Sequence, residues 1–96
     1  MSKFQAKVIK KLEEKGYTVL KTIRLNRSGY PDLLAMKKNE PDLWVECKEI
    51  NDTLKPLQKK RIDELNFLGK KAVCLQDKKG IIYPIGESEQ FKSLLL

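Results

Sequence analysis

The stretch that decides the expected fold is Leu43-Trp44-Val45-Glu46-Cys47-Lys48, in which apolar residues alternate with an acid and a lysine two positions apart. A second apolar run, Leu33-Leu34-Ala35-Met36, precedes it, and the residues between the two runs, Lys38, Asn39, Glu40 and Pro41, are typical of a turn. The two runs therefore predict a β-hairpin. If this hairpin is centred near Asn39, Asp32 stands directly opposite Glu46, with Cβ atoms roughly 4.5–5.5 Å apart.

The segments on either side predict two helices and three further strands. Apolar residues recur at helical spacing over residues 2–15, where Ser2 and Gln5 form a capping pair, and over residues 54–68, where Leu57 and Leu68 are expected on the buried stripe. Strands are expected over residues 17–23, 72–75 and 81–85, and a loop over residues 24–30. The order α-β-β-β-α-β-β predicts one α/β domain of the mixed α+β kind over residues 1–96.

The chain carries 20 Lys and Arg against 13 Asp and Glu, a formal charge of +7 in 96 residues. A folded domain with such an excess tends to attract polyanions, of which nucleic acid is the commonest. A surface that is merely soluble accounts for the charge equally well. Charge alone therefore leaves both interpretations open.

The chain has no histidine and two cysteines, Cys47 and Cys74. The absence of histidine excludes Cys/His zinc sites, Ser-His-Asp triads and histidine general bases. Both cysteines lie in apolar stretches and are expected as buried thiols, which fits a reducing compartment. No apolar run approaches the roughly 20 residues of a membrane span, and no signal peptide is indicated. We therefore expect a cytoplasmic protein with no membrane partner.

An acid followed two residues later by lysine occurs three times, at Glu13, Asp77 and Glu46. The first instance lies on the expected first helix, where residues two apart point in different directions, and the second lies in a turn. Only Glu46 and Lys48 lie in a strand, where residues two apart share a face. The strand therefore selects this pair as the candidate site.

Asp32 and Glu46 on opposite strands would repel one another, and a hard divalent cation with oxygen ligands turns that repulsion into binding. The backbone carbonyl of Cys47 is a candidate third ligand. Mg²⁺ held there lowers the pKa of a bound water and neutralises charge on a phosphate. Lys48 would then orient the attacking water or stabilise the charged transition state. A solvent-facing strand whose charges only solvate it is the alternative, and it stays open here.

Three motifs follow one another in order: Ser28-Gly29-Tyr30-Pro31-Asp32-Leu33-Leu34-Ala35, then Trp44-Val45-Glu46-Cys47-Lys48, then Lys55-Pro56-Leu57-Gln58. This combination resembles the VRR-NUC group of the PD-(D/E)XK nuclease superfamily in its small standalone form, from the first helix to about Leu75. The resemblance implies a restriction-endonuclease-like core, in which a mixed central sheet is flanked by helices. It also implies metal-dependent phosphodiester cleavage and structure-selective DNA substrates.

The resemblance further implies roles for individual residues. Asp32 and Glu46 would be metal ligands, and Lys48 the catalytic lysine. Gln58 matches a glutamine that supports the site from the start of the second helix, although an ordinary first-turn helix residue is its alternative. Gln5 departs from the glutamate that many relatives carry on the first helix. It is either a further candidate ligand or only a cap partner.

The leading hypothesis is a Mg²⁺- or Mn²⁺-dependent DNA endonuclease, acting as a homodimer on branched DNA such as Holliday junctions or flaps. Its candidate phosphate contacts are Lys10, Lys11, Arg24, Arg27, Lys55 and Lys59. A catalytically inactive nucleic-acid-binding module of the same fold is the runner-up. A protein-interaction domain whose charge serves solubility alone is the third hypothesis.

Overall fold

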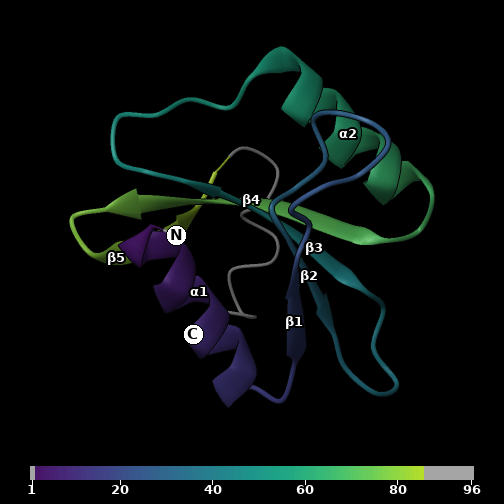
Figure 1. The fold of residues 1–96 in the computed structure, drawn as a ribbon, viewed down its shortest axis with the longest axis horizontal. Coiled ribbons are helices and arrows are strands. Elements are labelled where there is room, and N and C mark those ends of the chain that lie inside the picture. The colour runs from purple at the N-terminus through teal and green to yellow at the C-terminus, as the bar shows by residue number, and fades with distance from the viewer. Residues whose placement is uncertain (1, 86–96) are drawn as a thin grey trace.

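A computed structural model describes residues 2–85, and residue 1 and residues 86–96 lie outside the description, including the part of the predicted single domain that falls there. The described residues form elements in the order α1 (Lys3–Glu14), β1 (Thr18–Lys21), β2 (Leu33–Met36), β3 (Leu43–Lys48), α2 (Pro56–Phe67), β4 (Lys71–Lys78) and β5 (Ile81–Pro84). This is the predicted order. Figure 1 shows the sheet running through the centre, with α1 and α2 on either side of it.

The strands of the described residues form a five-stranded sheet in the order β1-β2-β3-β4-β5. Three neighbouring pairs are antiparallel, and β3 with β4 is parallel, with α2 as the crossover between them. The register of the central hairpin pairs Leu33 with Val45 and Leu34 with Trp44. The predicted register is therefore confirmed, and its continuation by one residue sets Asp32 opposite Glu46.

Each helix covers one face of the sheet with its own apolar cluster. Phe4, Val8 and Leu12 of α1 pack on side chains that include Leu33 and Val45. On the opposite face, the α2 cluster consists of Ile62 and Leu65 against Ala72 and Cys74, with Trp44 beside them. Because side chains alternate along a strand, odd positions of β3 face α1 and even positions face α2. The core thus consists of two apolar clusters, one on each face of the sheet.

Several element boundaries differ by one or two residues from the prediction, and the larger differences concern β1, β4 and two leucines. β1 ends at Lys21 rather than continuing to residue 23, because Thr22 makes the last backbone hydrogen bond to the segment before β2 and Ile23 is 87% exposed. β4 is twice the predicted length, since it pairs with β3 on one side and β5 on the other. Leu57 and Leu68 are exposed rather than buried, since the buried residues of α2 are Ile62 and Leu65. No helix among residues 2–85 is long and apolar enough to cross a membrane.

Candidate active site

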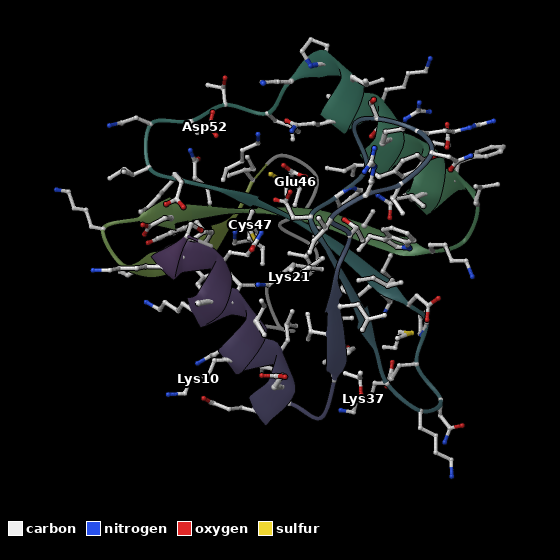
Figure 2. All side chains as sticks on the ribbon, in the orientation of Figure 1. Lys10, Lys21, Lys37, Glu46, Cys47 and Asp52 are labelled. Atoms are coloured by element: carbon white, nitrogen blue, oxygen red, sulfur yellow. The ribbon has the colours of Figure 1, made fainter. Side chains whose placement is uncertain are left out.

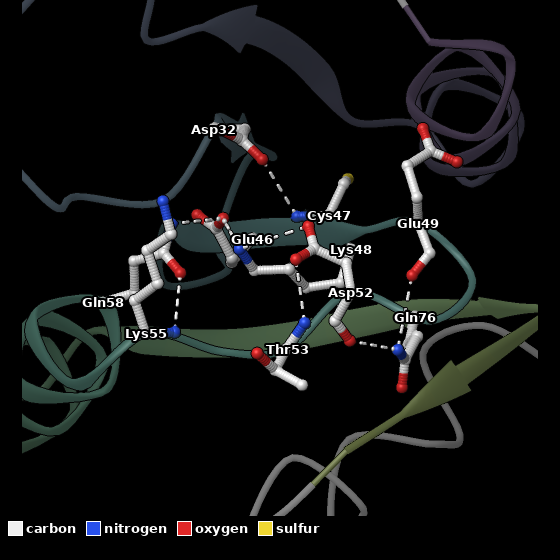
Figure 3. Close-up of polar contacts among 10 residues, drawn as sticks. All are labelled: Asp32, Glu46, Cys47, Lys48, Glu49, Asp52, Thr53, Lys55, Gln58 and Gln76. Carbon is white, nitrogen blue, oxygen red and sulfur yellow. Dashed lines mark hydrogen bonds and ion pairs between the residues drawn. The ribbon is translucent and has the colours of Figure 1, made fainter.

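Glu46 and Lys48 lie side by side on the face of β3 that α2 covers. Their exposed fractions are only 3% and 4%, and Lys48 Nζ lies 3.5 Å from Glu46 Oε2. A solvent-facing strand would leave both side chains exposed, so this alternative is wrong. Figure 3 shows both side chains within a group of polar contacts that draws on β3, α2 and the segment between them.

Asp32 is held at the beginning of β2 by backbone contacts on two sides. Its Oδ2 accepts a hydrogen bond from the backbone N–H of Cys47 at 3.1 Å, and its carbonyl accepts one from the N–H of Thr22 at 2.8 Å. The Thr22 hydroxyl also donates to the carbonyl of Pro31, which is fully buried. Thr22 was not singled out from the sequence, because its role depends on β1 lying beside β2. The Asp32 carboxylate is thereby fixed next to the strand that carries Glu46.

Gln58 joins Glu46 to the beginning of α2. Its Oε1 accepts the backbone N–H of Lys55 at 2.9 Å, and its Nε2 donates to Glu46 Oε2 at 3.2 Å. Because the oxygen of the amide is taken by the backbone donor, its NH₂ group faces the carboxylate. The hydrogen bond from the Lys55 N–H to Gln58 Oε1 also satisfies one of the backbone N–H groups at the start of α2. Gln58 is therefore in contact with the candidate site.

Asp52 forms an ion pair with Lys48, although the sequence did not mark it as a site residue. Its Oδ2 lies 3.7 Å from Lys48 Nζ, so the lysine stands between Glu46 and Asp52. The segment that carries Asp52 is tied to β4, since Gln76 Nε2 donates to the carbonyls of Glu49 and Asp52 at 3.3 and 2.7 Å. No sequence pattern marks Asp52, because its position depends on the irregular path of the chain after β3.

A second group of contacts anchors the loop before Asp32 to α2. The Tyr30 hydroxyl donates to Glu64 Oε1 at 2.7 Å, which lowers the pKa of Glu64, and Arg61 Nε donates to the carbonyl of Ser28 at 3.0 Å. The Arg61 guanidinium also lies 4.8 Å from the centre of the Tyr30 ring. This group positions the segment that leads into Asp32. Sequence reasoning did not single out Tyr30 or Arg61 for that role.

The pKa of Glu46 is raised from 4.5 to about 7. Burial is the main cause, and the negative charge of Asp32 acts in the same direction, whereas the Lys48 ammonium lowers the pKa. Burial also raises the pKa of the thiols of Cys47 and Cys74, which keeps both neutral near pH 7. The two thiols point to opposite faces of the sheet. A further positive charge near Glu46 would therefore favour its ionised form.

The donors that converge here suit a hard cation. Asp32 and Glu46 offer carboxylate oxygens. The N–H and the carbonyl of any one strand residue point to the same side of the strand. Because the Cys47 N–H donates to Asp32, the Cys47 carbonyl also points toward Asp32. Among residues 2–85, no group of three or more His, Cys, Asp or Glu side chains forms a metal site. A site at this position would therefore use two carboxylates and backbone oxygen, with water as the remaining ligand.

Gln5, Lys10 and Lys11 lie on α1, across the sheet from Glu46. Figure 2 shows Lys10 directed away from the sheet, while Glu46 lies on the other side. The backbone N–H of Gln5 donates to Ser2 Oγ at 2.9 Å, which confirms the helix cap. Within residues 2–85 the side chain of Gln5 makes no recorded hydrogen bond to Asp32 or Glu46. Its role as a ligand stays a prediction.

The other candidate phosphate contacts lie near α2. Arg24 and Arg27 line an open polar hollow of about 260 Å³ on the loop before Asp32. Lys55 directly precedes α2, and Lys59 follows one turn later, with its Nζ 3.1 Å from Asp63 Oδ2. The structure thus brings four of the six basic residues to the α2 side of the sheet.

Comparison with known proteins agrees with this geometry. The sequence profile of the VRR-NUC domain matches residues 1–76. A solved structure described as a VRR_NUC domain is 24% identical with a TM-score of 0.67, over 95% of this chain and 88% of that chain. Hjc, a Holliday junction resolvase from Archaeoglobus fulgidus, is 15% identical with a TM-score of 0.62, over 84% of this chain and 69% of that chain. No curated protein matches by sequence. Because the family profile covers most of the chain and the fold is restriction-endonuclease-like, the chain belongs to the VRR-NUC domain family of the PD-(D/E)XK nuclease superfamily.

Proposed function

We propose that this chain is a divalent-metal-dependent DNA endonuclease in which Asp32 and Glu46 hold Mg²⁺ or Mn²⁺. The observation that carries the proposal is the convergence of two carboxylates and a lysine at one nearly buried point. Glu46 Oε2 lies 3.5 Å from Lys48 Nζ, and the Asp32 carboxylate lies 3.1 Å from the backbone nitrogen of Cys47. Burying Glu46 beside the partly exposed Asp32 carboxylate costs free energy, and a bound cation would offset that cost.

The carboxylates and the Cys47 carbonyl are the ligands that Mg²⁺ and Mn²⁺ prefer. Held by these residues, the ion would supply a positive charge that lowers the pKa of the attacking water and neutralises charge on the scissile phosphate. In the reaction, the water oxygen gives up one proton to solvent and bonds to phosphorus. The bond from phosphorus to the leaving sugar oxygen breaks, and that oxygen takes up a proton from solvent. Family membership supports this class of reaction.

Lys48 is the group that acts on the reacting atoms. Its ammonium lies 3.5 Å from Glu46 Oε2 and 3.7 Å from Asp52 Oδ2, and we assign one of its three N–H donors to the attacking water or a phosphate oxygen. Gln58 holds Glu46 in orientation through the 3.2 Å hydrogen bond, which makes it a positioning residue. Asp52 does the same for Lys48.

Branched DNA is the proposed substrate, and a homodimer the proposed form. The charge of +7 and the basic residues beside α2 support a polyanionic ligand. The likeness of fold to a Holliday junction resolvase supports a branched one. A symmetric dimer would present two equivalent sites to the similar strands of a junction. Neutral thiols at Cys47 and Cys74 suit the reducing interior of a cell.

The test is cleavage of labelled four-way junction, flap, single-stranded and plain duplex DNA with Mg²⁺, Mn²⁺ or EDTA. Asp32→Asn keeps an oxygen that can accept the Cys47 N–H but removes the charge, and Lys48→Met keeps the aliphatic chain but removes the ammonium. We expect both variants to lose metal-dependent cutting while remaining folded. Analytical ultracentrifugation of the same samples tests for the dimer.

Asp42→Asn is the matched control, because Asp42 also follows a proline but lies at the other end of β3 from Lys48. It should cut as the wild type does. Equal cutting by the wild type, Asp32→Asn and Lys48→Met would contradict the proposal, because the activity would then not depend on these residues and would come from a contaminating nuclease. Binding of branched DNA without cutting in Mg²⁺ or Mn²⁺ would instead support an inactive binding module of the same fold.

A further inference from the structure

A hollow of about 550 Å³ opens at the end of the sheet that carries β5. It is lined by Ile50, Lys78, Lys79, Ile81 and Tyr83, and we call it the Tyr83 hollow. Its apolar members are unusually open to solvent, with exposed fractions of 48% for Ile50, 57% for Ile81 and 38% for Tyr83. An open apolar surface rimmed by lysines marks a place where a ligand with an apolar body and a negative charge can bind.

The Tyr83 hollow lies on the same face of the sheet as the candidate active site. Lys48 on β3 pairs with Gln76 on β4, and Gln76 pairs with Tyr83 on β5. Residues paired across neighbouring strands point to the same face. At ~4.8 Å between strands, Tyr83 stands roughly 10 Å across the sheet from Lys48. The hollow is therefore a neighbour of the site on the same face of the sheet, with Gln76 between them.

One segment of chain connects the two places. Ile50 lines the hollow, and Asp52, two residues later, forms the ion pair with Lys48 at 3.7 Å. Gln76 fixes this segment to β4 by donating to the carbonyls of Glu49 and Asp52. The wall of the hollow and the contacts of the catalytic lysine are thus parts of one hydrogen-bonded unit.

The chemistry of the Tyr83 hollow fits a nucleotide. The Lys78 ammonium lies 5.1 Å from the centre of the Tyr83 ring, and Lys79 stands at the turn beside it. A ring and two isoleucine side chains offer an apolar surface to the face of a base, and the lysines offer charge to its phosphate. In an intact duplex each base face is covered by its neighbours, so only an unstacked base can use such a surface.

We propose that the Tyr83 hollow binds an unpaired base of the DNA substrate, close to the phosphate that is cut. This rests on the proposed nuclease function and adds how the enzyme selects its substrate. A span of roughly 10 Å corresponds to about three stacked steps of one strand at ~3.4 Å each. The unpaired base therefore belongs within about three nucleotides of the scissile bond. Strands that part at a branch point supply such a base, and plain duplex does not.

The test measures KM and kcat on one branched substrate with either a normal nucleotide or an abasic site at each of the positions around the cut. For the wild type, we expect an abasic site at one or two positions to raise KM by roughly 10-fold, with little change in kcat. Tyr83→Ala should raise KM similarly on the normal substrate and lose its sensitivity to the abasic site. Tyr83→Phe should restore both, because the phenyl ring stacks equally well.

Phe67→Ala is the matched control, since Phe67 is an aromatic residue exposed by 89% at the end of α2. It should leave KM and the abasic pattern unchanged. If Tyr83→Ala keeps the wild-type sensitivity to abasic sites, the inference fails while the nuclease stands. If Tyr83→Ala instead turns a dimer into a monomer in the ultracentrifuge, the hollow is an interface between copies and the inference also fails.

Base binding by the Tyr83 hollow can also be tested without cleavage, so that failure of the proposed nuclease function is distinguished from failure of this inference. Fluorescence of 2-aminopurine in a short single-stranded oligonucleotide reports base stacking in EDTA, where no cutting occurs. Quenching by the wild type and Tyr83→Phe, but not by Tyr83→Ala, would support the hollow as a base site even if no substrate is cut. Equal quenching by all three proteins would overturn it.

Discussion

Replacing Glu46 by glutamine should make the metal-free protein more stable at alkaline pH while abolishing metal-dependent activity. Glutamine has the shape of glutamate and keeps an oxygen to accept the Gln58 hydrogen bond. Lys48 retains its ion pair with Asp52. The substitution removes one buried charge together with its ion pair to Lys48, and it keeps the hydrogen bond from Gln58. Its effect on the free energy of unfolding therefore reports the net cost of that charge, which is the cost of burial and of the Asp32 charge less the attraction of Lys48.

The magnitude follows from the pKa of Glu46, raised from 4.5 to about 7 by burial and by Asp32. Each pKa unit is worth 1.36 kcal/mol, so keeping this carboxylate ionised in the folded state costs at most about 3 kcal/mol. Because the folded pKa lies above the unfolded one, folding is favoured while Glu46 stays protonated. That contribution is fully present below about pH 4.5 and is lost as pH rises through about 7.

The assay is urea unfolding of wild type, Glu46→Gln and the control Glu13→Gln in EDTA, from pH 4.5 to pH 8. Glu13 is exposed on α1 and is also followed two residues later by a lysine. Wild type and Glu46→Gln should be equally stable at pH 4.5. At pH 8 Glu46→Gln should be more stable by about 1–3 kcal/mol, or roughly 5–20 °C in Tm.

Added Mg²⁺ should stabilise the wild type at pH 8, by about 2.7 kcal/mol at 100 times Kd, and leave Glu46→Gln unchanged. Glu13→Gln should follow the wild type throughout. If Glu46→Gln is the less stable protein at pH 8 without metal, the ion pair with Lys48 outweighs the cost of burial. The reasoning from desolvation would then be refuted.

Three further predictions concern contacts around the site. Gln58→Ala should weaken the apparent Mg²⁺ affinity by 10- to 100-fold in cleavage titrations, because Glu46 loses its positioning hydrogen bond; an unchanged titration would contradict this. Gly29→Ala should lower the free energy of unfolding by about 1–3 kcal/mol in urea, since Gly29 has a φ of +86° and an added Cβ would lie 2.6 Å from an α2 side chain. Lys55→Gln should reduce the slope of log binding against log salt by about 1, whereas Lys10→Gln on α1 should leave the slope unchanged; equal slopes for both variants would argue against a phosphate contact at Lys55.

The hairpin register was predictable because the turn residues fixed its centre. Asn39, which has a φ of 65°, lies at the middle of the connection and so fixes which residues pair across the hairpin. The alternation of side chains along each strand then decides which of them share a face. The pairing of Asp32 with Glu46 followed from local sequence alone. The apolar periodicity also predicted both helices, since a helix buries one stripe whatever its partner.

The parallel pairing of β3 and β4 was not predictable from the residues, because it depends on the path of α2 over the sheet. That crossover brings Gln76 beside Lys48 and sets Asp52 against its ammonium. Neither residue carries a sequence signal of its own. The contact between Gln58 and Glu46 has the same origin, so periodicity could suggest only a first-turn helix residue there.

The position of Glu46 distinguishes a functional acid from a structural one. A structural ion pair such as Lys59 with Asp63 lies on the surface, where water solvates both charges and little stability depends on either. Glu46 is 3% exposed, faces a second carboxylate, and shares its lysine with Asp52. Burial and the second carboxylate disfavour the ionised form of Glu46, and the Lys48 ammonium offsets only part of that cost, since the pKa is still raised to about 7. The proposed divalent cation would supply the missing positive charge. The pH dependence of unfolding without Mg²⁺ measures the cost of the buried acid, and the same measurement with Mg²⁺ tests whether a cation offsets that cost.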